Sequence, residues 1–417
     1  MSVFNAYMSL SGATDAYVLR DEKLSRRTSY RIGGPARLLV LVHSYAALGK
    51  VVDVLAEEHV DWVILGKGSN VLASDAGYEG AVIVLDDEFA RVTVDAEQGT
   101  VTAGAGALLS KVVADAAKAE LSGLEFCVGI PGTVGGAVSM DAGTRREWIG
   151  RCVRDLVVYR PGEGLHRYEG HEIEWGYRCT SIPTSEIILE ATFALKKGER
   201  AAISADMESR LARRRRTQPM GKPTCGSVFR NPTDGSAGKL VEACGCKGLS
   251  SGRAQISTEH ANFIVNNGGA SAADVLSLIQ LMHDSVLANS GVDLRCEVKL
   301  LGFGEWGTHG LLVQEGHAPQ GDAALRGCPL HAPRLRAARA EGPSRPEGPA
   351  CPEGLPRAVG PSCPEGSPCG QAFVPDAWSP RRRAQGSRRR CRPGVPRSRR
   401  AAGWQRGSGS PERQGAP

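Results

Sequence analysis

The sequence has no apolar run long enough to cross a bilayer and no start typical of a secreted protein. A membrane-spanning helix needs about 18–20 consecutive apolar residues, and no stretch of the 417 residues approaches that length. The first 24 residues contain no basic segment followed by an apolar core, which is the pattern of a secretory signal. These absences predict a cytoplasmic protein with no membrane partner.

Paired cysteine motifs are also missing. Residues 1–320 hold seven cysteines, and only Cys244 and Cys246 lie close together. Structural zinc sites usually take two such pairs, and an odd, unpatterned set is typical of reduced thiols in a reducing compartment. We therefore expect free thiols and no metal site.

Lysine is absent from Gly321 to Pro417, where 18 arginines face only 7 acidic residues. This +11 balance within a chain of +6 leaves −5 for residues 1–320. The segment also holds 16 of the 24 prolines. With few large apolar residues it cannot offset its ordering entropy, so we predict a disordered tail over 304–417. It is either an arm for nucleic acid or anionic surfaces, or a solvated appendage. We favour the appendage and expect no nucleic-acid partner for the body.

Residues 1–303 alternate strand and helix patterns, which predicts an α+β fold. The runs ARLLVLV (36–42) and WVIL (62–65) suggest buried strands around a helix over 44–58, a βαβ unit. Residues 81–195 are richer in strands, with one helix at 108–119. An arginine-loaded helix at 203–216 precedes another α/β unit, with GSVFR (226–230) as a strand and a capped helix at 271–289. We place domain boundaries to give 1–85, 86–202, 203–303 and the tail.

Two glycine-rich loops are candidate phosphate or cofactor sites. The first, Gly66-Lys67-Gly68-Ser69-Asn70, follows a predicted strand and can expose consecutive N–H groups. It matches neither the P-loop nor the G-x-G-x-x-G pattern. The second places four glycines and a proline within residues 129–137. Each loop also has a purely structural interpretation as a tight turn or crossing, and the residues alone leave both interpretations open.

Three further residues carry potential chemistry. Arg178 follows an aromatic residue, as many surface arginines do. Ser227 follows a glycine but lacks the G-x-S-x-G elbow, which argues against a hydrolase nucleophile. Glu297 is an acid in an otherwise apolar strand, so it either faces solvent or turns into a site. The strand alternation does not decide between these two positions.

Taken in order, these clusters resemble the UDP-N-acetylenolpyruvoylglucosamine reductase family. The similar stretches span residues 28–302, about two thirds of the chain. They are TSYRIGGPA (28–36), LGKGSN (65–70), GLEFCVGIPGTVGGAV (123–138), YRCTSIP (177–183), QPMGKPTCGSVFRNP (218–232), AGKLVEACGCKG (237–248), AQISTEHANFIVN (254–266) and EVKLLG (297–302). The short spacing between the fourth and fifth stretches resembles the shorter of the family's two forms.

The resemblance implies an FAD-binding fold of the vanillyl-alcohol-oxidase (PCMH) type in two subdomains, followed by a substrate domain. It implies tightly bound, non-covalent FAD and NADPH as hydride source. Flavin N5 would deliver hydride to C3 of an enolpyruvyl UDP-sugar, with Ser227 giving a proton to C2 and Arg178 and Glu297 at the carboxylate. We expect a monomer.

The residues implied for the cofactor and the substrate lie in the matching stretches. Those for FAD are Gly66, Lys67, Gly68, Ser69, Asn70, Gly129, Ile130, Pro131, Gly132, Thr133, Gly135 and Gly136. Those for the substrate are Tyr177, Arg230, Asn231, Lys239 and Lys247.

Three residues depart from the family pattern. Asp141 stands in place of a usual Asn and puts an acid near the flavin pocket. Arg253 replaces a glycine, which questions a positive φ there, and Arg230 replaces a common Lys. Two other functions stay open: a flavin oxidase of the same fold, and a degenerate flavoprotein with a nucleic-acid-binding tail. The oxidase would usually carry a covalent flavin link, for which His43 and His59 are poorly placed.

Overall fold

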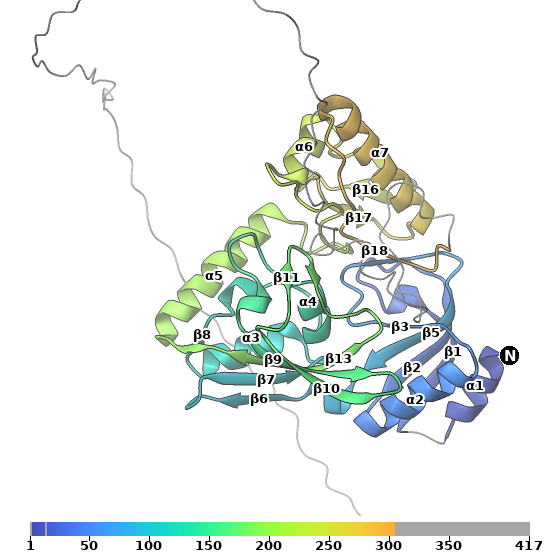
Figure 1. Cartoon of the computed structure of the whole chain (residues 1–417). Coiled ribbons are helices and arrows are strands. Elements are labelled where there is room, and N and C mark those ends of the chain that lie inside the picture. Colours follow the sequence, from blue (N-terminus) through green and yellow to red (C-terminus); the bar gives the residue numbers. More distant parts are fainter. Residues whose placement is uncertain (1, 13–14, 305–417) are drawn as a thin grey trace, which may run out of the picture. The chain divides into compact units, whose positions relative to one another are not determined.

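A computed structural model describes residues 2–12 and 15–304 (Figure 1). The predicted tail lies outside the described residues, apart from Gly304. Across these two ranges, no helix combines the length and the apolar character that crossing a membrane requires.

The N-terminal sheet is built around two largely buried central strands. Its order is β1 (Ala16–Lys23), β2 (Pro35–Val42), β5 (Tyr78–Leu85) and β3 (Trp62–Ile64). Leu38 and Val40 of β2 enter one apolar cluster, and Leu39 enters another on the opposite face. Burial on both faces explains the continuous apolar run of β2.

Helices α1 (Val3–Leu10) and α2 (Tyr45–Glu57) contribute to the first of these clusters. The predicted βαβ unit is confirmed, with Ser44 capping α2 by accepting a hydrogen bond from the N–H of Ala47. However, β5 lies between the two strands of the unit and is parallel to both.

The second sheet is antiparallel and has five strands. Their order is β10 (Gly164–Glu169), β9 (Val153–Arg160), β13 (Ile187–Ala194), β7 (Thr100–Gly104) and β6 (Val92–Asp95). The predicted helix at 108–119 is confirmed as α3 (Leu109–Lys118), and the arginine-loaded helix as α5 (Arg200–Thr217). Short elements complete this part: α4 (Val134–Ser139), β8 (Leu121–Ser122), β11 (Trp175–Gly176), β12 (Cys179–Thr180) and β14 (Lys196–Lys197).

The C-terminal part combines two helices with a small antiparallel sheet. Its elements are α6 (Ala237–Ala243), β15 (Ser250–Ser251), β16 (Ala254–Ile256), β17 (Ile264–Asn266) and α7 (Ala272–Ser290). The predicted cap of α7 is confirmed, because Ser271 and Asp274 form a reciprocal capping box. The last strand, β18 (Lys299–Leu301), pairs in parallel with β4 (Val71–Ala73), far away in sequence.

The strand predicted over GSVFR is wrong. Residues 226–230 form only two isolated bridges, Ser227 with Phe263 and Phe229 with Cys296. The segment lies between the chain around Phe263 and the chain around Cys296, and it forms a continuous strand ladder with neither. The side chain of Asn262 replaces a strand partner: its Nδ2 donates to Phe229 O at 2.8 Å and its Oδ1 accepts from Phe229 N at 3.0 Å.

Asn262 is 2% exposed, so Asn262→Ala would leave the N–H and C=O of Phe229 buried and unpaired. A buried polar group without a partner costs about 1–3 kcal/mol. We expect the free energy of unfolding in urea to fall by about 2–4 kcal/mol. The control is Asn267→Ala, whose exposed amide makes one 3.4 Å contact with Gln255 Oε1. Equal losses in the two variants would contradict this role of Asn262.

Candidate functional site

A cleft of about 1620 Å³ collects most of the predicted residues. Both glycine loops line it, together with Arg178, Ser227 and Glu297. These residues come from five distant parts of the chain. The structure therefore brings together the two loops and the three chemical residues that the sequence suggested separately.

The first glycine loop turns sharply after β3 and leaves several N–H groups without partners. Gly68 has φ +57°, and a Cβ there would lie 2.4 Å from Arg27 O, so only glycine fits. Among the hydrogen bonds of residues 15–304, none uses the main-chain N–H of Gly66, Lys67, Gly68 or Ser69. Such a run of N–H groups in the lining of a cleft suits an anionic group.

The second glycine loop lies against the first. Ser69 Oγ donates to Pro131 O at 3.1 Å, which ties the two loops together. Gly129 faces helix α5, where the Cδ of Arg214 would be 3.1 Å from an added Cβ. Ile130, Pro131, Gly132, Thr133 and Gly136 also line the cleft, whereas Gly135 packs on Ala105 behind it.

Arg178 and Glu297 form an ion pair in the cleft wall. Arg178 Nε lies 2.6 Å from Glu297 Oε1, and the side chains are 18% and 12% exposed. Arg178 also donates to Gly143 O at 3.2 Å and lies over the ring of Tyr177. Its φ of +65° is a left-handed conformation that few arginines adopt. Glu297 therefore turns into the site, the alternative that the sequence left open.

Ser227 lies between two neighbouring segments that hold its backbone. Next to it, Val228 N donates to Asn262 O at 2.8 Å, and Glu297 N donates to Val228 O at 2.7 Å. Ser227 Oγ lines the cleft and makes no hydrogen bond within the part of the chain that the structure describes. Its hydroxyl proton is thus available to a ligand.

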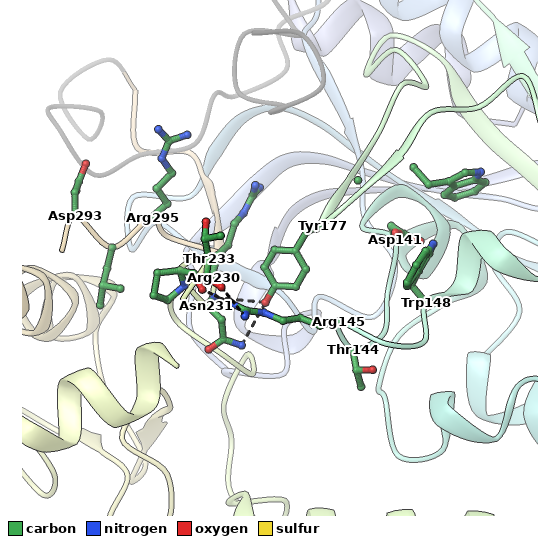
Figure 2. A pocket seen from close by; sticks show the side chains of 14 residues that line it. Asp141, Thr144, Arg145, Trp148, Tyr177, Arg230, Asn231, Thr233, Asp293 and Arg295 are labelled. Atoms are coloured by element: carbon green, nitrogen blue, oxygen red, sulfur yellow. Dashed lines mark hydrogen bonds between the residues drawn. The ribbon is translucent and has the colours of Figure 1, made fainter. Parts of the chain in front are cut away.

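The predicted substrate residues divide into two groups. Tyr177 and Asn231 line both the cleft and an adjoining cavity of about 820 Å³, and Arg230 lines that cavity (Figure 2). Lys239 lines the cleft. Lys247 does not, and its Nζ lies 2.7 Å from Glu242 Oε1.

Three polar side chains of the cleft were missed by sequence reasoning. Burial lowers the pKa of Arg214, with Arg178 and Arg210 contributing as nearby cations. Burial and Arg230 lower the pKa of Lys299. Thr224 Oγ1 is buried with no partner among the described residues. The four-residue spacing of Arg210 and Arg214 puts them on one face of α5, but nothing in the sequence shows that this face meets the cleft.

The structure shows how the chain accommodates Arg253 and Asp141, two of the departures from the family pattern. Positive φ occurs at Gly252, with +51°, and not at Arg253, so the arginine is accommodated without strain. Asp141 lines the adjoining cavity, and its neighbours Met140 and Ala142 line the cleft. Its burial raises the carboxyl pKa to about 6, although the Gly150 N–H and Arg178 oppose this.

Because its folded-state pKa is raised, Asp141 favours folding below its ordinary pKa of 3.8, and this contribution is lost as pH rises to about 6. Asp141→Asn keeps an acceptor for Gly150 but cannot ionise. We expect the stability of the variant relative to wild type to increase by about 2 kcal/mol between pH 4.5 and 7.5. Urea unfolding at both pH values measures this, and a difference that is independent of pH would contradict it.

Comparisons with known proteins agree with this geometry. The model of the FAD binding domain family matches residues 36–161. The model of the UDP-N-acetylenolpyruvoylglucosamine reductase C-terminal domain matches residues 218–301. Together they cover both glycine loops, Ser227 and Glu297.

Similar proteins are also described as UDP-N-acetylenolpyruvoylglucosamine reductases, and the alignments cover nearly their whole length. The UDP-N-acetylenolpyruvoylglucosamine reductase of Heliobacterium modesticaldum is 41% identical over 286 residues, 68% of this chain and 90% of its own. That of Myxococcus xanthus is 44% identical over 283 residues, 67% and 91% of the two chains. The crystal structure of the Thermus caldophilus reductase superposes with a TM-score of 0.60 at 35% identity, covering 69% of this chain and 98% of that one. The predicted fold class is confirmed, and the chain belongs to the UDP-N-acetylenolpyruvoylglucosamine reductase family.

Proposed function

We propose that this protein reduces UDP-N-acetylglucosamine enolpyruvate to UDP-N-acetylmuramate for peptidoglycan synthesis, with bound FAD and with NADPH as hydride source. The observation that carries the proposal is the convergence of Arg178, Glu297 and Ser227 on one cleft with two glycine loops. Relatives described as UDP-N-acetylenolpyruvoylglucosamine reductases support it.

The cleft residues fit FAD. The unpaired N–H groups of residues 66–69 suit its diphosphate, and Arg214 adds a half-buried positive charge beside the second loop. Thr224 Oγ1 is an unpartnered polar atom that a flavin or its phosphates could satisfy. When bound, FAD supplies the hydride for C3 of the enolpyruvyl group. The chain's own residues bind the cofactor, orient the substrate and handle the proton.

Arg178 is suited to hold the substrate carboxylate. Addition of hydride to the enolpyruvyl group builds negative charge next to this carboxylate, so fixed positive charge there lowers the barrier. The guanidinium presents several N–H groups in one plane for a carboxylate. Its contacts with Glu297 and Gly143 O fix the plane before substrate binds.

Ser227 is suited to deliver a proton to C2. A hydroxyl is a weak acid, but a carbanion next to a carboxylate takes a proton from a well-placed O–H. Glu297 lies on the segment next to Ser227, and its ion pair keeps the Arg178 guanidinium in place for the substrate carboxylate. The backbone bonds of Val228 hold these two segments together.

Tyr177, Arg230, Asn231 and Lys239 border the space left for the sugar diphosphate, and we assign them to it. Lys247 lies outside the cleft lining, so its contact with substrate stays a prediction. None of the seven described cysteines forms a disulfide with another described residue, which supports a cytoplasmic location. The monomeric state stays a prediction.

A spectrum of the purified protein tests the cofactor assignment. We expect a yellow protein whose visible absorption is bleached by NADPH under anaerobic conditions. After acid precipitation the colour should remain in the supernatant, because the flavin is bound without a covalent link. Colour that stays with the pellet would favour the flavin oxidase alternative.

Ser227→Ala separates proton delivery from cofactor chemistry. We expect the variant to bind FAD and to be reduced by NADPH at the wild-type rate. Its turnover of the enolpyruvyl substrate should fall by about 10²–10⁴-fold, as is typical of the loss of a general acid. Ser250→Ala, an exposed serine outside the cleft, is the matched control. Normal turnover by Ser227→Ala would remove Ser227 from the mechanism.

A further inference from the structure

Arg145 joins two parts of the chain that are far apart in sequence. It lies between α4 and β9, and its guanidinium reaches the loop at residues 231–236 before α6 (Figure 2). Nη1 donates to Thr233 O at 2.8 Å. Nη2 donates to Pro232 O and, at 3.3 Å, to Gly235 O. One side chain thus donates to three main-chain carbonyls of the opposing loop.

The turn that carries Arg145 is fixed by its own hydrogen bonds. Thr144 Oγ1 accepts from the N–H groups of Arg146, at 3.2 Å, and Glu147, at 3.1 Å. Gly143 has φ +156°, and a Cβ there would lie 2.3 Å from Glu147 O. The Glu147 carboxylate accepts both Nη atoms of Arg210 on α5. The turn at residues 143–147 therefore holds the backbone of Arg145 in place, independently of the opposing loop.

The chain at residues 141–143, next to this turn, also holds Arg178. The carbonyl oxygens of Asp141 and Gly143 accept from its two Nη atoms at 3.5 and 3.2 Å. Arg145, two residues further along, holds the opposing loop. The position of that loop relative to Arg178 is thus set through a span of only five residues.

The opposing loop carries groups that face the cleft. Asn231 Oδ1 accepts from Ala237 N at 3.0 Å, which closes the loop on itself before α6. Asn231 also meets Tyr177 Oη, but its N and Nδ2 are both 3.4 Å away, long for hydrogen bonds. The hydrogen bonds from Arg145 to the loop are shorter than these two contacts with Tyr177. The loop follows directly from the Ser227 segment.

We propose that Arg145 is a positioning residue for substrate binding. Its clamp on the loop carbonyls sets the distance from Arg178 to Asn231, which a ligand must bridge when its carboxylate binds at Arg178 and its diphosphate at Asn231. This proposal rests on the proposed reductase function. Arg145 itself transfers no proton and need not touch the reacting atoms.

Three variants test the clamp. Arg145→Ala removes all three hydrogen bonds, and Arg145→Lys keeps the charge but offers a single nitrogen for the three carbonyls. Arg253→Ala is the matched control, because this exposed arginine also donates to a main-chain carbonyl, Gly268 O at 2.9 Å, but outside the cleft. For each purified holoenzyme we would measure FAD content, thermal midpoint, and kcat and KM for the enolpyruvyl substrate.

We expect Arg145→Ala to raise KM for the enolpyruvyl substrate about tenfold, with kcat within about threefold of wild type, since it weakens binding more than chemistry. Arg145→Lys should recover part of this loss, and Arg253→Ala should match wild type. FAD content should stay the same in all three.

An unchanged KM in Arg145→Ala would overturn the proposal. So would a change that appears equally in Arg253→Ala or that only follows a loss of FAD. A wild-type protein without reductase activity would instead reject the proposed function. In that case substrate binding could still be measured by titration, using the shift of flavin absorption as the signal. This titration would show whether Arg145→Ala weakens substrate binding.

Discussion

The ion pair between Arg178 and Glu297 spans 119 positions of the chain and closes the wall of the cleft. Placing two charges in a half-buried site costs desolvation, which is offset only when the remaining donors are also satisfied. Here the carbonyls of Asp141 and Gly143 each accept one N–H, from Nη1 and Nη2, which leaves the second N–H of each nitrogen for a ligand. The left-handed backbone of Arg178 costs about another 1 kcal/mol. The rest of the fold must supply this energy.

The surroundings of the pair explain how the fold supplies it. Asn262 replaces a strand partner for Phe229 and so aligns the Ser227 segment with Glu297. The turn at residues 141–147 supports Arg178 from the other side. The half-buried cations Arg214 and Lys299 lie on the same cleft, so its field attracts anionic ligands. Cofactor and substrate of the proposed reaction are both anionic, and their charges offset the cations that burial makes costly.

Patterns that depend on local chemistry could be predicted from the sequence. The apolar run of β2 and the cap of α7 follow from side chains within a few positions. Pairings between distant segments could not. Nothing near GSVFR shows that an asparagine side chain replaces a ladder, and nothing in the arginine-rich helix distinguishes Arg214 from its exposed neighbours. The role of Arg145 could not be predicted either. Its three partners are main-chain carbonyls, which are present in every sequence and leave no pattern of side chains.

The pairing of β18 with β4 has a consequence for the order of synthesis. Asn70 Nδ2 donates to Glu297 O, 227 residues later, and Lys299 N donates to Asn70 O. At about 5–20 residues per second on the ribosome, the first glycine loop waits roughly 10–45 seconds for these partners. A nascent chain that stops before residue 297 lacks one wall of the cleft. The complete cleft therefore assembles late in synthesis, although its first loop is made early.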